Sequence, residues 1–427
     1  MRIRFYNARI LTLDNSFDII SGELWVNNGK IEYIGDKKKD MPIFDKTINV
    51  ENNLLMPGFK NAHTHSAMTF LRGYAEDMPL EIWLNERVFP SEAKLEEGDC
   101  YNLVRLAMLE YIEGGITSCM DMYAFEEETV QAAEDIGMRV VLSDPMNDFS
   151  SSISRQEELY KQFNGGSELV SKVLGFHAVY TTSEPLLKEL AAIAHKYKAP
   201  VYTHCSESES EVQNCIKEHG KTPVEYLNDM GIFDYGGAIY HGVHLTDKDC
   251  DILKQKNVSV VTCPSSNLKL ASGIASVAKL AEMGINVGIG TDGPASNNAL
   301  DMFREMYLVS TLQKYLLKDA SAMPAESVLK MATVGSARAM GLNDCDCLRK
   351  GKCADIIMLD LKQPDMQPEN NIVKSIVYSA SKKNIKMTMI NGNIVYMDGI
   401  YYIGESLDNI FAAATQTAER LKGGKVL

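Results

Sequence analysis

The sequence predicts an α/β fold: a (β/α)8 barrel with a small composite β-sandwich domain built from both termini. In the middle of the chain, apolar runs of five to eight residues alternate with helical segments. That alternation is typical of parallel strands joined by crossover helices. Eight such units over about 290 residues match the number of units in a barrel of this kind. Both ends of the chain are instead rich in short strands and turn residues.

The predicted barrel strands are short and apolar, and loop or helical sequence follows each one. They cover residues 54–63, 116–122, 139–143, 173–178, 200–205, 238–244, 258–263 and 286–291. A doubly wound open sheet is the alternative architecture. The one Gly-x-Gly-x-x-Gly match, Gly288–Gly293, begins inside the last predicted strand, and no such turn follows any of the earlier strands, so the barrel is favoured.

The two ends of the chain are expected to pair with each other. Strands are predicted at 2–11, 22–26 and 30–34, and again at 354–359, 373–378, 385–390, 393–396 and 399–403, with Asn-Gly and Asp-Gly turns between some of them. A helix over 407–422 closes the chain. The expected division is a small β domain from 1–56 and 350–427, and a catalytic barrel from 57–349.

The composition is that of an ordinary globular protein, with 45% hydrophobic and 23% charged residues. A formal net charge of −14 argues against nucleic acid or an anionic membrane as a partner. No apolar run reaches the roughly 20 residues of a membrane span, and the N-terminus lacks a signal-peptide pattern. We therefore expect a cytoplasmic protein. Its nine scattered cysteines predict reduced thiols; for the cluster Cys345, Cys347 and Cys353, a structural zinc site is the alternative.

Metal-binding residue types gather at the ends of the predicted strands. The first strand runs into Met56-Pro57-Gly58-Phe59-Lys60-Asn61-Ala62-His63-Thr64-His65, and histidines two apart in an extended segment point to the same side. Later strand ends carry His177, His204, His241, His244 and Asp292, so that six of the eight histidines lie at strand ends. Active sites of such barrels lie at these ends, so we expect the side chains to meet.

Three imidazoles and one carboxylate, from His63, His65, His204 and Asp292, would form a nitrogen-rich site for a divalent metal. Zinc is the first expectation and iron the second. One ion per subunit is expected, because the fourth strand has no lysine at its end to be carboxylated and bridge two ions. An open coordination position would let the metal lower the pKa of a bound water to about 7, which makes the predicted site catalytic.

Further motifs follow the strands. They are Leu71-Arg72-Gly73-Tyr74-Ala75-Glu76-Asp77, Trp83-Leu84, His204-Cys205-Ser206-Glu207, His241-Gly242-Val243-His244-Leu245, Ser265-Ser266-Asn267-Leu268-Lys269-Leu270 and Gly290-Thr291-Asp292-Gly293-Pro294-Ala295-Ser296-Asn297-Asn298. With them the whole chain resembles the amidohydrolase superfamily in its single-metal deaminase branch. Within that branch it is most similar to the methylthioadenosine/S-adenosylhomocysteine deaminase family. Guanine deaminases and triazine chlorohydrolases share much of the pattern.

The resemblance implies hydrolytic deamination of the adenine ring of a 5′-modified adenosine, and a homo-oligomer. It assigns Asp292 and His241 to deprotonation of the metal-bound water, which attacks C6 of the ring. It assigns Glu207 to proton transfer, first to ring N1 and then to the leaving amine. Glu92 matches an acceptor for the ribose diol, and His177 matches a histidine that reaches a purine ring nitrogen.

Each of these residues also has a structural interpretation. Glu207 opens the acidic run 207–211, which is typical of a solvated helix start, and Glu92 would suit the first turn of a helix. His177 and His241 would then be buried structural histidines.

The stretch after the third strand departs from the family pattern. Family members that use S-adenosylhomocysteine have an arginine there for the amino-acid carboxylate, whereas this chain has Asp144-Pro145. Two facing carboxylates repel each other, so methylthioadenosine, 5′-deoxyadenosine or adenosine are favoured over S-adenosylhomocysteine. Arg155 is a candidate replacement for the missing arginine, and the segment 147–155 is a candidate lid.

Two other functions fit part of the pattern. A guanine deaminase or a chlorohydrolase-like enzyme would have no diol for Glu92 to bind. A non-catalytic scaffold would be expected to have lost a metal ligand or Glu207, and the chain retains all of them.

Overall fold

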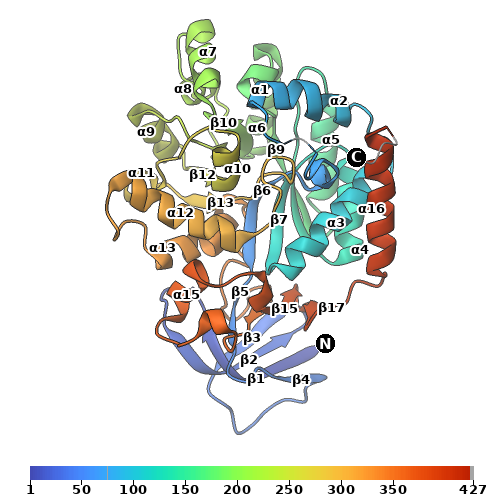
Figure 1. Cartoon of the computed structure of the whole chain (residues 1–427), viewed down its shortest axis with the longest axis vertical. Helices are drawn as coiled ribbons and strands as arrows, with labels where there is room; N and C mark the ends of the chain where they lie inside the picture. Colours follow the sequence, from blue (N-terminus) through green and yellow to red (C-terminus); the bar gives the residue numbers. More distant parts are fainter. Residues whose placement is uncertain (75, 424–427) are drawn as a thin grey trace.

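A parallel barrel with a separate sheet at one end makes up the protein, for which the computed structural model describes residues 1–74 and 76–423 (Figure 1). Eight parallel strands follow one another around the barrel in chain order. They are β6 (Phe59–Thr64), β7 (Ile116–Met122), β8 (Arg139–Ser143), β9 (Val170–Gly175), β10 (Val201–Cys205), β11 (Gly237–His241), β12 (Val258–Thr262) and β13 (Val287–Ile289). The predicted (β/α)8 barrel is confirmed.

The first and last strands meet at their carboxyl ends. The Asn61 amide donates to the Thr291 hydroxyl at 2.7 Å, and the Asp292 backbone N–H donates to the His63 carbonyl at 3.0 Å. Gly290 permits this approach, because a Cβ there would lie 2.8 Å from the same carbonyl oxygen. The closure places the end of β13 directly beside the first two predicted metal ligands.

Apolar side chains fill the barrel interior, and helices cover its outside. The interior cluster includes Ala62, Met120, Val141, Tyr202 and Tyr240. The covering helices are α3 (Asp99–Glu113), α4 (Glu126–Ile136), α5 (Ile153–Phe163), α6 (Glu184–Tyr197), α7 (Glu209–His219), α8 (Pro223–Asp229), α9 (Asp247–Gln255), α10 (Pro264–Lys269), α11 (Val277–Glu282), α12 (Met302–Leu317), α13 (Ala325–Lys330) and α14 (Ser336–Ala339). Between β6 and α3 lie the short helices α1 (Leu80–Trp83) and α2 (Phe89–Glu92), near the carboxyl ends of the strands (Figure 1).

Strands from both termini form the second sheet, in the order β17-β16-β15-β14-β5-β1-β2-β3 with β4 paired to β1. Their bounds are β1 (Arg2–Leu11), β2 (Ile19–Asn27), β3 (Lys30–Gly35), β4 (Lys46–Asn49), β5 (Leu54–Pro57), β14 (Ile356–Leu359), β15 (Ile385–Ile390), β16 (Asn393–Met397) and β17 (Ile400–Tyr401). Ile3, Phe5, Ile356 and Met387 share one buried core there. This separate sheet confirms that strands from both termini assemble together, as the sequence predicted.

Two predicted strands differ from the structure. The segment 54–63 is split, because β5 pairs with β1 and β14 of the small sheet and only β6 belongs to the barrel. The segment 373–378 is a helix, α15 (Ile372–Tyr378), which Asn371 caps by accepting from the Lys374 N–H. Its β-branched residues suggested a strand, but Val373, Ile376 and Val377 are buried at helical spacing.

The last helix, α16 (Leu407–Leu421), lies beside α3 on the outside of the barrel, drawn in red in Figure 1. Arg420 pairs with Asp99, and Arg105 with Glu405. The division into a small domain (1–56 with 350–427) and a barrel (57–349) stays a prediction. The helix α16, which that division assigns to the small domain, contacts α3 of the barrel. None of the nine cysteines forms a disulfide, and no helix in the described residues is long and apolar enough to cross a membrane.

Candidate active site

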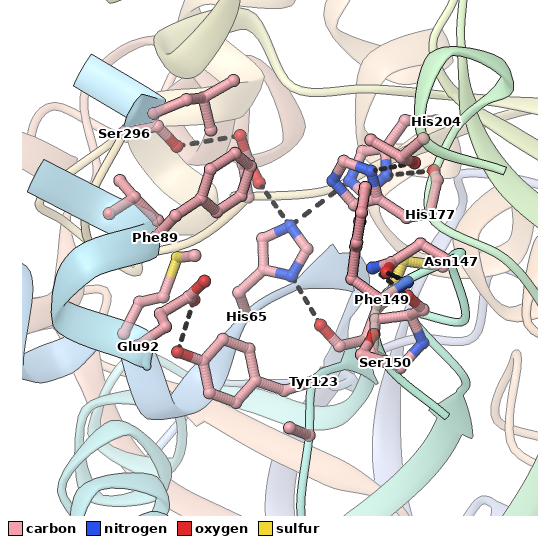
Figure 2. A pocket seen from close by; sticks show the side chains of 18 of the residues that line it. His65, Phe89, Glu92, Tyr123, Asn147, Phe149, Ser150, His177, His204 and Ser296 are labelled. Carbon is pink, nitrogen blue, oxygen red and sulfur yellow. Dashed lines mark hydrogen bonds and ion pairs between the residues drawn. The ribbon is translucent and has the colours of Figure 1, made fainter. Parts of the chain in front are cut away.

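A cavity of about 650 Å³ opens at the carboxyl ends of the barrel strands (Figure 2). This is a typical size for a small-molecule site. Predicted site residues line it together with apolar side chains from the β6–α3 segment. The predicted residues in its wall are His65, Glu92, His177, His204, Glu207, His241 and Asp292.

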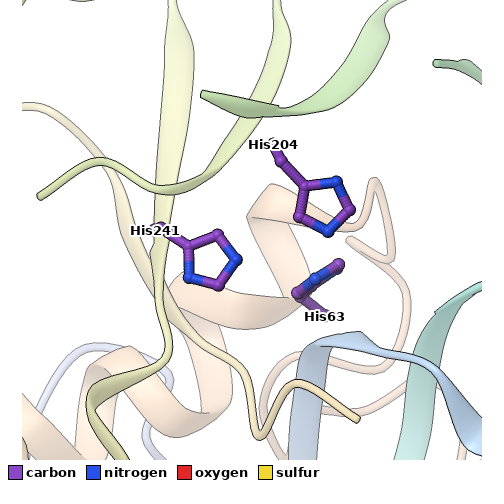
Figure 3. Close-up of side chains that lie close together, drawn as sticks. All are labelled: His63, His204 and His241. Carbon is purple, nitrogen blue, oxygen red and sulfur yellow. The ribbon is translucent and has the colours of Figure 1, made fainter. Parts of the chain in front are cut away.

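Two overlapping groups of metal-ligand atoms lie beneath this cavity. His63, His65 and Asp292 form one, and His63, His204 and His241, drawn in Figure 3, form the other. In each group the ligand atoms lie within 4.8 Å of one another. The strand-end residues that the sequence placed far apart thus converge on one point.

Backbone carbonyls orient two of the imidazoles. His65 Nδ1 lies 2.6 Å from the Met122 carbonyl, and His204 Nδ1 lies 2.7 Å from the His177 carbonyl. Each Nδ1 therefore donates its proton, and the two Nε2 atoms face each other across 3.3 Å. This arrangement fixes the tautomer and aim of a histidine ligand in metal sites.

His63 supplies the clearest sign that the group fits a cation. Its side chain is fully buried, yet neither ring nitrogen has a hydrogen-bond partner in the described structure. Burial lowers the pKa of His63 to about 3 and that of His204 well below its usual range, so both imidazoles are neutral and can donate a lone pair. These two neutral imidazoles, together with the imidazole of His65 and the carboxylate of Asp292, are a set of ligands that fits a divalent metal.

Asp292 uses its two oxygens differently. Oδ1 lies 3.5 Å from His63 Nε2 and 3.2 Å from His65 Nε2. Oδ2 accepts hydrogen bonds from the hydroxyls of Ser266 at 2.5 Å and Ser296 at 2.8 Å. Neither serine was predicted as a site residue, although both lie in the motifs that carry the family resemblance.

Glu207 and His241 form a second pair at the edge of the cluster. Glu207 Oε2 lies 3.7 Å from His241 Nε2, and its Oε1 accepts from the Ser272 hydroxyl at 3.3 Å. Glu207 precedes α7, whose N-cap is Ser208, so it is not part of the solvated helix face. Glu211 fixes this turn by accepting from the backbone N–H groups of Ser206 and Glu207 at 2.9 and 2.8 Å.

His241 is held in a strained backbone conformation. Its φ of 70° lies in the left-handed region, as does the φ of 59° at Asp292, which is uncommon for residues other than glycine. The Asn267 carboxamide oxygen lies 2.8 Å from His241 Nδ1, which leaves Nε2 facing Glu207. Strain of this kind gathers at functional sites.

The two predicted substrate contacts both reach the cavity. Burial and the nearby charges of His65 and His241 lower the pKa of His177 to about 4, so its ring is neutral. Its Nδ1 pairs with the Thr181 hydroxyl at 2.9 Å. Glu92 Oε1 accepts from the hydroxyl of Tyr123 at 2.6 Å. Tyr123 had no predicted role, because nothing in the sequence links it to Glu92.

Asp144 and Arg155 are not where the sequence suggested. Asp144 is buried and does not line the cavity, and its carboxylate lies 3.8 Å from Lys172 Nζ, which also binds Glu126. The expected repulsion between Asp144 and a substrate carboxylate is therefore wrong. Arg155 lies on the surface of α5, pairs with Glu127 and Glu158 and does not line the cavity, and its contact with the substrate stays a prediction that the structure does not support.

The model of the amidohydrolase family matches residues 54–395, which span the whole barrel and part of the small sheet. This chain belongs to the amidohydrolase family. This amidohydrolase is 39% identical to the 5-methylthioadenosine/S-adenosylhomocysteine deaminase of Caldanaerobacter subterraneus subsp. tengcongensis, over 92% of this chain and 93% of the relative. It is 41% identical to the 5′-deoxyadenosine deaminase of Methanothermobacter thermautotrophicus, over 83% and 84% of the two chains.

A solved structure resembles the amidohydrolase over almost its full length. It is an adenosine deaminase from Xanthomonas campestris with bound zinc, with a TM-score of 0.93 and 29% identity over 99% of this chain and 98% of that one. The suspected resemblance to methylthioadenosine/S-adenosylhomocysteine deaminases is thereby confirmed. The roles of the individual site residues stay predictions.

Proposed function

We propose that this amidohydrolase is a metal-dependent aminohydrolase that converts a 5′-modified adenosine into the inosine analogue and ammonia. The observation that carries the proposal is the meeting, in one cavity, of the histidine and aspartate cluster with Glu207 and Glu92. The relatives named as deaminases of 5-methylthioadenosine, S-adenosylhomocysteine and 5′-deoxyadenosine support the substrate class.

One divalent metal ion would be held by His63, His65, His204 and Asp292. Such an ion lowers the pKa of a water that it binds to about 7 and so supplies a nucleophile at neutral pH. Zinc is the first candidate, supported by the zinc in the adenosine deaminase structure, and iron is the second. The carbonyls of Met122 and His177 aim His65 and His204 before any ion binds.

Glu207 and His241 would move the protons. His241 presents Nε2 to the site and, with Asp292, would accept a proton from the attacking water. Glu207 would deliver a proton to ring N1 as the water oxygen adds to C6. The Glu207 carboxylate left by that step would take up the proton of the new C6 hydroxyl and pass it to the amino group as the C6–N bond breaks, which leaves the C6 carbonyl of the inosine analogue and ammonia.

Glu92 and His177 would hold the substrate, the carboxylate at the ribose hydroxyls and the neutral imidazole at a purine ring nitrogen. Trp83, Phe89 and Phe149 give the cavity apolar walls, and no lysine or arginine lines its described part. A neutral 5′-group fits such walls better than an amino-acid carboxylate does. We therefore expect methylthioadenosine, 5′-deoxyadenosine or adenosine to be preferred over S-adenosylhomocysteine. Homo-oligomerisation and a cytoplasmic location remain predictions.

Ammonia release by zinc-loaded protein tests the reaction directly. The substrates are methylthioadenosine, S-adenosylhomocysteine, 5′-deoxyadenosine, adenosine and guanine. We expect turnover of the neutral adenosines, and a loss of about 100-fold or more in kcat in Glu207→Gln, because proton transfer by a positioned side chain contributes about 10²–10⁴-fold. Glu209→Gln, in the exposed first turn of α7, is the matched control and should keep full activity.

Other outcomes would change the assignment. Turnover of guanine alone would keep the metal site and remove the role given to Glu92. Metal binding with no release from any substrate would point to another leaving group, as in a chlorohydrolase, or to a scaffold.

A further inference from the structure

Tyr123 links the rim of the barrel to the short helix α2 at the cavity. It directly follows β7, and its side chain is only 7% exposed. Its hydroxyl donates to Oε1 of Glu92, the last residue of α2, over 2.6 Å (Figure 2). The preceding residue, Met122, offers its carbonyl to His65 Nδ1. One strand end therefore fixes both a metal-site histidine and Glu92.

Glu92 relies on this single contact for its orientation. Within residues 1–74 and 76–423, the Tyr123 hydroxyl is the one hydrogen-bond partner of the Glu92 carboxylate. The described lining of the cavity also contains no lysine or arginine that could attract it. A glutamate has three rotatable side-chain bonds, and ordering them costs conformational entropy. The Tyr123 bond orders this side chain before a ligand arrives.

The chemistry of the pair leaves room for a diol. Burial and the charge of Glu92 raise the pKa of Tyr123 well above its usual range, so the phenol stays protonated and acts as a donor. An ionised carboxylate has about four acceptor sites on its two oxygens. Tyr123 takes one of them on Oε1, and Oε2 has no hydrogen-bond partner in the described structure. The remaining sites suffice for two hydroxyl groups.

The Tyr123 hydrogen bond also favours the charged form of Glu92. Burial raises the pKa of Glu92, and the bond from Tyr123 opposes that rise. The ionised carboxylate only accepts, so it offers the two hydroxyls more acceptor sites than the protonated form does.

We propose that Tyr123 is a positioning residue for Glu92, and that the pair selects nucleosides with an intact 2′,3′-diol. The inference rests on the proposed function, in which Glu92 binds the ribose. Without the phenol, the substrate itself must order Glu92, so riboside binding weakens while the chemistry at C6 is unchanged. Tyr123 therefore acts on KM through the diol alone.

Tyr123→Phe removes only the hydroxyl and tests this directly. Adenosine and 2′,3′-dideoxyadenosine are the substrates, because they differ only in the diol. We expect the KM for adenosine to rise roughly tenfold, which is the size of effect expected when one charge-assisted hydrogen bond is lost. The kcat for adenosine should stay within about twofold of the wild-type value. Neither constant should change for the dideoxy substrate. Glu92→Gln should reduce the same preference, and the double variant should reduce it no further, since the two residues act as one unit.

Tyr101→Phe is the matched control. The Tyr101 hydroxyl donates to the carboxylate of Asp135 at 2.7 Å, outside the cavity. Tyr101→Phe therefore removes a similar hydrogen bond and leaves Glu92 unchanged. It should leave the preference for adenosine unchanged. Equal losses for both substrates in Tyr123→Phe would indicate a merely structural role and overturn the proposal, as would an unchanged preference.

Calorimetric binding of the two nucleosides to chelator-treated protein gives a readout that needs no turnover. A wild-type preference for adenosine that disappears in Tyr123→Phe supports the proposal even if no ammonia is ever released. In that case the proposed function alone fails. A wild-type protein with no preference for the diol overturns the inference.

Discussion

Single side chains explain why the metal-site residues keep a fixed geometry. Asp292 turns Oδ1 towards His63 and His65 because Ser266 and Ser296 hold Oδ2 on its other side. A carboxylate held in this way does not have to be ordered when an ion arrives. The sequence predicted Asp292 from its place after an apolar strand. Ser296 follows it by four residues, but Ser266 lies in α10 and reaches Asp292 only in the folded barrel.

The double variant Ser266→Ala/Ser296→Ala should bind the metal more weakly. Loss of partners that orient a ligand typically costs 10–100-fold in affinity, so we expect a loss of about that size. Competition with a chromophoric chelator measures it. Ser310→Ala is the control, because Ser310 is also buried and donates to the Met323 carbonyl at 2.9 Å, away from the site. Unchanged zinc affinity in the double variant would show that the serines do not position Asp292.

At the scale of elements, the segment after β8 contains one residue held by hydrogen bonds, Asp148, directly followed by one that is exposed to solvent, Phe149. The Asp148 carboxylate accepts from the Ser183 N–H at 2.9 Å, and its own N–H donates to the Thr181 carbonyl at 3.1 Å. The next residue, Phe149, is 93% exposed although it borders the cavity. An exposed aromatic ring at the mouth of a pocket suits contact with a bound ligand.

If the segment 147–155 acts as a lid, Phe149 is therefore the residue that we expect to cover the bound ligand. Phe149→Ala should raise the KM for methylthioadenosine by roughly tenfold with kcat nearly unchanged, because a covered phenyl ring contributes about 1.5–3 kcal/mol of apolar burial. Ile43→Ala is the control, since Ile43 is 92% exposed and lies outside the cavity. The same KM in Phe149→Ala and wild type would argue against a lid.

Across the whole molecule, the sequence predicted features that depend on neighbouring residues, such as strands and their ends. It missed side-chain contacts between residues that lie far apart in the sequence. Period and turn residues predicted the eight barrel strands, and strand ends predicted where His63, His204 and Asp292 meet. The pattern failed at 373–378, where β-branched residues lie on a helix, and at Asp144, whose partner Lys172 is set by the packing of β8 and β9. Contacts such as that between Tyr123 and Glu92 depend on how helices lie over the strand ends, which a single sequence does not encode in any short motif.

Another long-range contact joins the barrel to the terminal sheet. Asp355, just before β14, lies fully buried with Arg139 of β8 and Lys60 of β6. Arg139 binds it through Nε at 2.9 Å and Nη2 at 3.0 Å, and the Asn391 N–H donates to it at 2.8 Å. Lys60 Nζ lies 3.5 Å away. One carboxylate from residue 355 thus neutralises two buried cations of the barrel.

Asp355→Asn should destabilise the fold by about 3–5 kcal/mol at pH 7, because it leaves two buried cations without a charge partner. Burial alone would raise the pKa of Asp355, but the charges of Arg139 and Lys60 hold it well below its ordinary value of 3.8. The stabilisation is therefore complete above that value and is lost as pH falls below it, since the unfolded chain then binds the extra proton. Urea unfolding at pH 7 and pH 3 should show a smaller difference between wild type and variant at pH 3. Glu51→Gln, which breaks the exposed pair with Lys362, should change stability by less than about 1 kcal/mol at either pH. An Asp355→Asn effect as small as that would mean that the buried carboxylate does not stabilise the contact between the barrel and the terminal sheet.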